Sequence, residues 1–194
     1  NYLDASVKSY ACACNSGSSA NLLLFSTLKS VGVLKNGDKI VVPASTFATV
    51  SSPLYQLGFT PIYVDCELET FCLNSNHIKD ALNEHPDIKA VMVVHNLGFS
   101  SNMYKLVDMC KENDLILVED CCEAHGGTFE NKKLGTFGDF STWSFFVAHN
   151  ITTGEGGLVV SNNEDYEDVM RSIREFGRRT TAKKRYEKTE NNDF

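Results

Sequence analysis

Long basic stretches and long apolar stretches are both missing from this chain of 194 residues. Its 18 Lys and Arg are outnumbered by 25 Asp and Glu, which gives a formal net charge of -7. Binding to nucleic acid or to an anionic membrane requires clustered positive charge, so we expect neither partner. No apolar run approaches the ~20 residues of a membrane span, and residues 1–11 lack a signal pattern. These absences predict a cytoplasmic protein with a small ligand.

Cysteines are present but lack the arrangement of a metal site or a disulfide framework. Their number, seven, is odd, and the pairs Cys12/Cys14 and Cys121/Cys122 lie inside apolar runs. We therefore expect reduced thiols, with Cys121 and Cys122 serving packing. Zinc ligands usually have at least two residues between them and a second pair elsewhere, so we predict no metal site.

The chain does not begin with Met, and residues 179–194 are charged and lack apolar periodicity. We expect a piece of a longer protein with one domain over residues 1–178. Residues 179–194 are either a solvated charged loop or the start of a missing C-terminal part.

Apolar segments rich in β-branched residues alternate with amphipathic segments along the chain. The pattern predicts helices at 18–31, 46–56, 76–83, 103–113 and 163–176, and strands at 39–42, 61–64, 90–95, 115–119, 140–146 and 157–161. Such alternation is typical of an α/β fold with a mostly parallel, doubly wound sheet. Ligands of these sheets bind beyond the carboxyl ends of the strands.

Small and polar residues precede the first predicted helix in the segment 15–20, Asn-Ser-Gly-Ser-Ser-Ala. Free backbone N–H groups and the helix dipole at such a position favour an anion, of which phosphate is the best candidate. Ser and Gly before a helix are also ordinary caps, so simple capping is the alternative.

Two further positions carry candidate chemistry. Asp120 ends the apolar strand at 115–119, where a buried carboxylate needs a partner such as a protonated pyridine nitrogen. Its alternative role is to cap the following turn. Ser144 and His149 follow an aromatic strand, where a hydroxyl suits phosphate and an imidazole transfers protons near neutral pH. A single histidine is more often structural, but this position at the mouth of the sheet favours a functional one.

Four segments, at 15–21, 119–126, 135–139 and 144–157, resemble the motifs of the DegT/DnrJ/EryC1/StrS family in order and spacing. The resemblance covers residues 12–178. It implies the large domain of the type I aspartate-aminotransferase fold, in part, with pyridoxal or pyridoxamine 5′-phosphate as cofactor. It also implies a homodimer that acts on a nucleotide sugar, in deoxysugar or lipopolysaccharide biosynthesis.

The resemblance assigns roles to matching residues. Gly17, Ser18 and Ser144 would hold the cofactor phosphate, Phe47 would stack on the pyridine ring, and Asp120 would pair with the ring nitrogen. Without the resemblance, Phe47 would be interpreted as a core aromatic of an amphipathic helix.

Glu123 and His149 depart from the pattern of the family's aminotransferases. Glu123 stands where these usually carry Gln, and would orient a cofactor oxygen or cap a turn. His149 stands five residues after Ser144, where they carry the lysine that forms a Schiff base with the cofactor. No lysine occurs between Lys133 and Lys183, and an imidazole cannot form that bond.

A histidine at this position resembles the family's 4-keto-6-deoxysugar 3-dehydratases, which are lyases. Their chemistry implies that pyridoxamine phosphate condenses with the C4 ketone and that His149 is the base whose proton transfer expels the C3 hydroxyl. An aminotransferase and a non-catalytic cofactor- or sugar-binding fragment stay open as alternatives. The [2Fe–2S] cluster of the CDP-sugar 3-dehydratases would need ligands outside this chain, because no cysteine follows Cys122.

Overall fold

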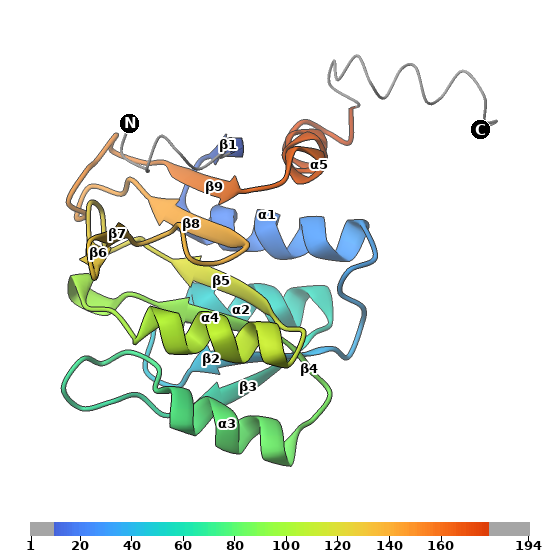
Figure 1. Ribbon diagram of the computed structural model, residues 1–194. Helices are drawn as coiled ribbons and strands as arrows, with labels where there is room; N and C mark the ends of the chain where they lie inside the picture. The colour runs from blue at the N-terminus through green and yellow to red at the C-terminus, as the bar shows by residue number, and fades with distance from the viewer. Residues whose placement is uncertain (1–9, 179–194) are drawn as a thin grey trace.

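A seven-stranded sheet with helices on both faces forms the protein in the computed structural model, which describes residues 10–178 (Figure 1). The elements in chain order are β1 Tyr10–Cys14, α1 Gly17–Ser30, β2 Lys39–Pro43, α2 Ala48–Leu57, β3 Thr60–Val64, α3 Ser75–Glu84, β4 Ile88–Val94, the 3₁₀ helix η1 Asn96–Gly98, α4 Met103–Glu112, β5 Ile116–Asp120, β6 Thr128–Phe129, β7 Lys132–Lys133, β8 Phe140–Ser144, β9 Gly157–Ser161 and α5 Glu164–Arg174.

The strands lie in the order β1-β9-β8-β5-β4-β2-β3. Strands β8, β5, β4, β2 and β3 are parallel to their neighbours in this run, whereas β9 is antiparallel to both β8 and β1. The predicted α/β architecture with a mostly parallel sheet is confirmed. The sequence pattern did not predict β1, η1 or the short β6–β7 hairpin.

Two apolar cores lie on opposite faces of the sheet. Helices α1, α2 and α5 pack on one face, and α3 and α4 on the other, as Figure 1 shows. Alternation along β2 illustrates the division, because Ile40 and Val42 join the first core and Val41 the second. The doubly wound arrangement follows from strands that are apolar on both faces.

Polar side chains define where the helices begin. Ser16 caps α1, since its Oγ accepts the Ser19 N–H at 3.1 Å. Asn163 caps α5, since its Oδ1 accepts the Asp165 N–H at 2.9 Å. Phe47 is the residue before α2 and has extended backbone angles, so that helix begins later than the predicted residue 46.

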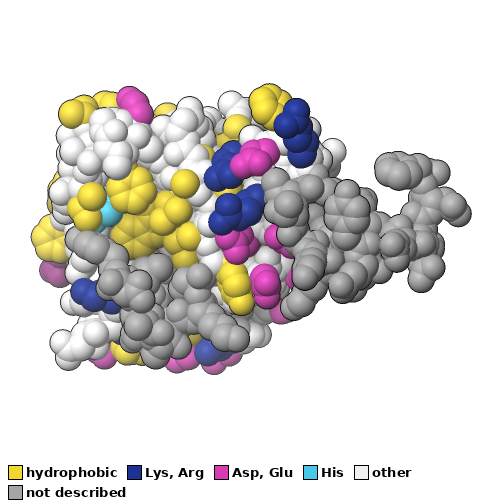
Figure 2. Space-filling view, turned by 90° about the horizontal axis from the view of Figure 1, so that it is seen from above, with side chains coloured by type: hydrophobic (Ala, Val, Ile, Leu, Met, Phe, Trp, Pro, Cys, Tyr) yellow, Lys and Arg dark blue, Asp and Glu magenta, His cyan; other side chains and the backbone are white. Residues whose placement is uncertain are grey.

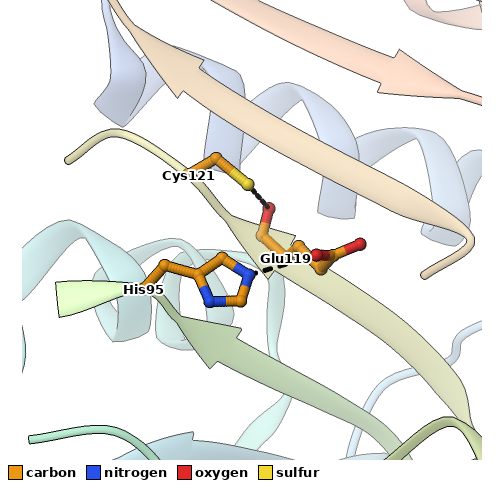
Figure 3. Close-up of side chains that lie close together, drawn as sticks. All are labelled: His95, Glu119 and Cys121. Atoms are coloured by element: carbon orange, nitrogen blue, oxygen red, sulfur yellow. Dashed lines mark hydrogen bonds and ion pairs between the residues drawn. The ribbon is translucent and has the colours of Figure 1, made fainter. Parts of the chain in front are cut away.

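A buried carboxylate fixes the loop that leads into β8. Glu119 has no exposed surface, and its two oxygens accept the N–H groups of Gly135, Phe137 and Gly138 at 2.7–2.8 Å. The His95 ring completes the set, with Nε2 3.1 Å from Oε2 of Glu119 (Figure 3). Four donors fill the lone pairs of one carboxylate.

The same carboxylate, His95 and Cys121 lie close enough together to hold a metal ion. However, the Glu119 oxygens are already used by backbone donors, and the Cys121 thiol points toward the Glu119 carbonyl (Figure 3). Burial, with the nearby charge of Glu119, also raises the pKa of Cys121. The hydrogen bonds of Glu119 make this cluster an anchor of the fold.

The predicted tail at 179–194 lies outside the described residues. All seven cysteines lie within them and are free thiols, as expected. Among helices in residues 10–178, none has both the length and the apolar character needed to cross a bilayer.

Candidate functional site

A cavity of about 470 Å³ opens where the carboxyl ends of β1, β2, β4, β5 and β8 meet. This is the edge at which a doubly wound sheet is expected to bind its ligand. The lining side chains are Ser16, Gly17, Ser18, Asn21, Thr46, Phe47, Thr49, Val50, Val94, Asn96, Asp120, Cys122, Glu123, Ser144, Phe146, His149 and Glu155.

Every site residue predicted from the sequence lies on this one cavity. They come from four separate parts of the chain: Gly17, Ser18, Phe47, Asp120, Glu123, Ser144 and His149. Seen from above, hydrophobic side chains gather around one histidine on the side where the parallel strands end, whereas acidic and basic side chains intermix near α5 (Figure 2).

The N-terminus of α1 and the end of β8 form the small-residue end of the cavity. Among the described residues, no acceptor takes the N–H groups of Gly17 and Ser18, which a helix leaves free at its start. The hydroxyls of Ser18 and Ser144 line the same space, and Ser18 Oγ also donates to Thr49 Oγ1 at 3.0 Å. These free donors and the helix dipole suit an anion.

Glycine is required at position 17 because of the closeness of β8. A Cβ added to Gly17 would lie 2.7 Å from the Ser144 Cβ and 3.0 Å from the Cys122 Sγ. We expect Gly17→Ala to push α1 away from Ser144, to lower the free energy of unfolding by about 1–3 kcal/mol and to remove stabilisation by inorganic phosphate. Thermal melts with and without phosphate measure both effects.

Gly154→Ala is the matched control, because a Cβ there meets nothing within 4 Å although its φ of +81° is strained for other residues. It should cost stability but keep the response to phosphate. An unchanged phosphate response in Gly17→Ala would remove the α1 terminus from the anion site.

Asp120 has the turn-capping role that its sequence position offered as one alternative, and it also lines the cavity. It is 5% exposed, and its Oδ1 accepts the Cys122 N–H at 3.0 Å, which caps the turn after β5. Its Oδ2 accepts Nδ2 of Asn21 at 3.1 Å. The carboxylate thus lies on the cavity wall in a fixed orientation.

Phe47 is not a core aromatic, because its side chain is 72% exposed on the cavity rim. It precedes α2 with extended backbone angles and so lies outside the helix. An aromatic ring left in solvent beside a cavity offers a flat surface for stacking a planar ligand.

Glu123 caps a turn, but not that of its own loop. Its Oε2 accepts the Leu97 N–H at 2.7 Å in η1, where Leu97 has a φ of 54°. The Glu123 side chain also lines the cavity. It joins the loops after β4 and β5 beside the Asp120 carboxylate.

His149 lies on a loop held by several hydrogen bonds. Its N–H donates to the Phe146 carbonyl at 3.0 Å, and Thr152 Oγ1 and Thr153 N both donate to the Phe145 carbonyl. The half-buried His149 ring lies 6.3 Å from the Phe146 ring and 6.4 Å from that of His125. The loop therefore presents an imidazole to the cavity from a fixed backbone.

His125 was not singled out by the sequence, but it supports this loop. Its ring packs on Trp143 and Phe145 at 5.4 and 5.5 Å, and neither ring nitrogen has a hydrogen-bond partner among the described residues. Burial lowers the pKa of His125 and the nearby His149 lowers it further, against a smaller opposite effect of the Ser144 carbonyl. The folded protein thus keeps this imidazole neutral.

A pH dependence of stability follows from His125. Its pKa is lower in the folded than in the unfolded chain, where it is near 6.5, so the unfolded chain binds more protons as the pH falls through this value. Because of His125, the free energy of unfolding therefore decreases as the pH falls below about 6.5. We expect His125→Phe to lose less stability than the wild type between about pH 7.5 and about pH 5 in urea unfolding. Parallel losses in both proteins would show that His125 does not titrate as described.

Cys122 differs from the expected packing role, which fits only the fully buried Cys121. The Cys122 side chain is half-buried and lines the cavity. Burial and then the charge of Asp120 raise the pKa of Cys122, so it faces the cavity as a neutral thiol.

Asn21 is the most informative residue that sequence reasoning missed. It lies among the apolar side chains of the buried face of α1, and a polar residue at such a position was the available signal. Other lining residues had no distinctive signal: Thr46, Thr49, Val50, Asn96, Phe146 and Glu155.

Comparison with known proteins finds relatives in a single family of sugar-modifying enzymes. The model of the DegT/DnrJ/EryC1/StrS aminotransferase family matches residues 2–192. A dTDP-4-dehydro-2,6-dideoxy-D-glucose 3-dehydratase of Saccharopolyspora spinosa is 40% identical over 168 residues, which are 84% of this chain and 36% of that protein. A GDP-perosamine synthase of Vibrio cholerae is 37% identical over 169 residues, 87% of this chain and 45% of that protein.

Among solved structures, an Escherichia coli GDP-4-keto-6-deoxy-D-mannose-3-dehydratase with bound hydrated PLP superposes with a TM-score of 0.82. It is 37% identical, and the match covers 87% of this chain and 43% of that one. The chain thus spans about two fifths of the length of these relatives.

Proposed function

Because the chain belongs to the DegT/DnrJ/EryC1/StrS aminotransferase family, we propose that it is the cofactor-binding part of a pyridoxal- or pyridoxamine-phosphate enzyme. The proposed reaction removes the C3 hydroxyl of a nucleotide-linked 4-keto-6-deoxysugar. The observation that carries this choice is the imidazole of His149 on the cavity, where the sequence offers no lysine. The names of two relatives, both 3-dehydratases, agree with it.

The residues on the cavity fit a phosphorylated pyridine. Free N–H groups of Gly17 and Ser18 and the Ser144 hydroxyl suit the phosphate, and Gly17 lets α1 approach Ser144 closely enough for these groups to share one site. The exposed Phe47 ring suits one face of the pyridine. Asp120 would pair with the ring nitrogen, since it is a buried carboxylate without a cationic partner among the described residues.

Each side chain then has a defined task. When bound, the cofactor would supply an electron sink next to the reacting carbon of the sugar. Asp120 would pair with the protonated ring nitrogen. His149 takes a proton on an imidazole nitrogen and, once charged, delivers it to the departing C3 oxygen. The stiff loop around His149 holds the ring in place for both transfers.

In the part of the chain that the structure describes, no lysine lines the cavity, so none is in place to form a Schiff base with the cofactor. A primary amine is needed for a covalent bond between protein and cofactor, and an imidazole cannot replace it. This observation favours the dehydratase over an aminotransferase.

An aminotransferase is the second candidate function. It is favoured by the family and by the 37% identity to a GDP-perosamine synthase, whose name denotes an amino sugar as product. The geometry of the phosphate end and of Asp120 serves both reactions equally.

We also propose a homodimer. Large apolar side chains are exposed in the loops around the cavity. Exposed apolar patches of this kind mark interfaces with another protein chain. The exposed side chains are Phe47, Leu97, Phe99, Phe146 and Val147.

The experiment uses the full-length enzyme with pyridoxamine phosphate and nucleotide-linked 4-keto-6-deoxysugars, with product mass as the readout. The dehydratase yields a sugar that has lost the C3 oxygen. A sugar that keeps this oxygen and gains nitrogen at C4 in the presence of an amino donor would establish the aminotransferase. Cofactor binding without either product would favour a binding role only.

A further inference from the structure

A buried amide contacts the carboxylate that the proposed function assigns to the cofactor ring. Asn21 is 2% exposed on the inner face of α1, and it lines the cavity. Its Nδ2 donates to Oδ2 of Asp120 and to the Thr49 carbonyl, both at 3.1 Å. Both partners are acceptors, so they fix which end of the amide faces Asp120.

Packing alone does not explain an asparagine at this position. Its Oδ1 is buried and has no hydrogen-bond partner among the described residues, which costs stability. The neighbouring buried side chains of α1 are Leu23, Leu24 and Leu28, and an apolar residue would join them without that cost. The retained amide therefore points to a role at the cavity.

The surroundings of Asp120 show what that role is. No Lys or Arg lines the described cavity, so neutral donors hold the carboxylate. The donors are the Cys122 N–H on Oδ1 and the Asn21 amide on Oδ2, and together they fix the orientation of Asp120.

Few titratable groups share this cavity. They are Cys122 and Glu123 on the loop of Asp120, and His149 and Glu155 between β8 and β9; α1, α2 and β4 contribute none. Asn21 itself does not titrate, so a change in the pKa of the ring nitrogen on replacing Asn21 would act through its contact with Asp120.

We propose that Asn21 is a positioning residue that holds Asp120 oriented toward the ring nitrogen of the cofactor. This inference rests on the proposed function. Without the amide, Asp120 would pair less well with the ring nitrogen. The ring would then lose its proton at lower pH, and the cofactor would bind more weakly.

The test measures pyridoxamine phosphate affinity and the pH midpoint of the bound cofactor's absorbance in the full-length enzyme. Asn21→Leu replaces the amide by an apolar side chain, and Asn21→Ala removes it altogether. We expect about tenfold weaker binding and a midpoint lower by about one pH unit in both. Asp120→Asn is the reference variant, with a larger change of the same sign.

Leu28→Ala is the matched control for helix packing. It removes a fully buried side chain of α1 that does not line the cavity, and it leaves Asp120 untouched. Its melting temperature should fall while the pH midpoint stays that of the wild type.

The outcomes separate the inference from the proposed function. A wild-type midpoint in Asn21→Leu and Asn21→Ala, with a changed midpoint in Asp120→Asn, would reduce Asn21 to packing. If Asp120→Asn also keeps the wild-type affinity and midpoint, the assignment of Asp120 fails and the role of Asn21 fails with it. Should Asn21→Leu not fold, Asn21→Ala decides alone.

Discussion

Replacing Glu119 by glutamine is expected to lower the free energy of unfolding by about 3–5 kcal/mol, the cost of breaking a buried charged network. The carboxylate is fully buried and accepts from three backbone N–H groups and faces the His95 ring. A glutamine of the same size turns one acceptor into a donor, which then meets other donors. Urea unfolding of wild type and Glu119→Gln measures the difference.

Asp139→Asn is the control from the same loop. Its carboxylate is exposed and accepts a single backbone N–H, that of Leu117 at 3.0 Å. We expect a loss of about 1 kcal/mol there. Equal losses in the two variants would mean that the buried network of Glu119 contributes no more than one surface hydrogen bond.

Replacing His149 by asparagine is expected to reduce turnover by about 10²–10⁴-fold, the usual contribution of a general acid or base. The affinity for pyridoxamine phosphate should stay nearly unchanged, because the proposed phosphate and ring contacts belong to Gly17, Ser144 and Asp120. Single-turnover kinetics of the full-length enzyme and a separate binding titration measure the two effects.

His77→Asn controls for the loss of a histidine as such. His77 lies on α3, and its Nδ1 is 3.1 Å from the Asp65 carbonyl, away from the residues that line the cavity. Turnover should be that of the wild type. If His149→Asn also retains full turnover, the proton transfers belong to another group.

The main elements of the fold could be predicted because the strands are apolar on both faces and the helices have polar caps. Strand β1 could not, because Tyr10–Cys14 contains no β-branched residue and its partner among the described residues, β9, lies far along the chain. The β6–β7 hairpin pairs only two residues on each strand, which is too little for a periodic pattern. Such elements depend on tertiary pairing and leave no local signal.

The cavity could be predicted in outline because its residues follow strands whose carboxyl ends share one edge. Residues that act from a helix interior or through a neighbour were harder to predict. Asn21 has its partner Asp120 far along the sequence, and His125 owes its neutral state to burial against Trp143 and Phe145. Phe47 was open to two interpretations because one residue decides whether it lies inside α2 or before it.

The central claim is that this enzyme uses an imidazole where its aminotransferase relatives use an amine. The measurement is mass spectrometry of the full-length protein after incubation with pyridoxal phosphate and reduction with borohydride, with His149→Lys as the positive control. We predict no covalent cofactor on the wild type and a reduced adduct on the His149→Lys variant. Stoichiometric attachment of the cofactor to a lysine of the wild type would contradict the dehydratase proposal and establish the lysine chemistry of an aminotransferase.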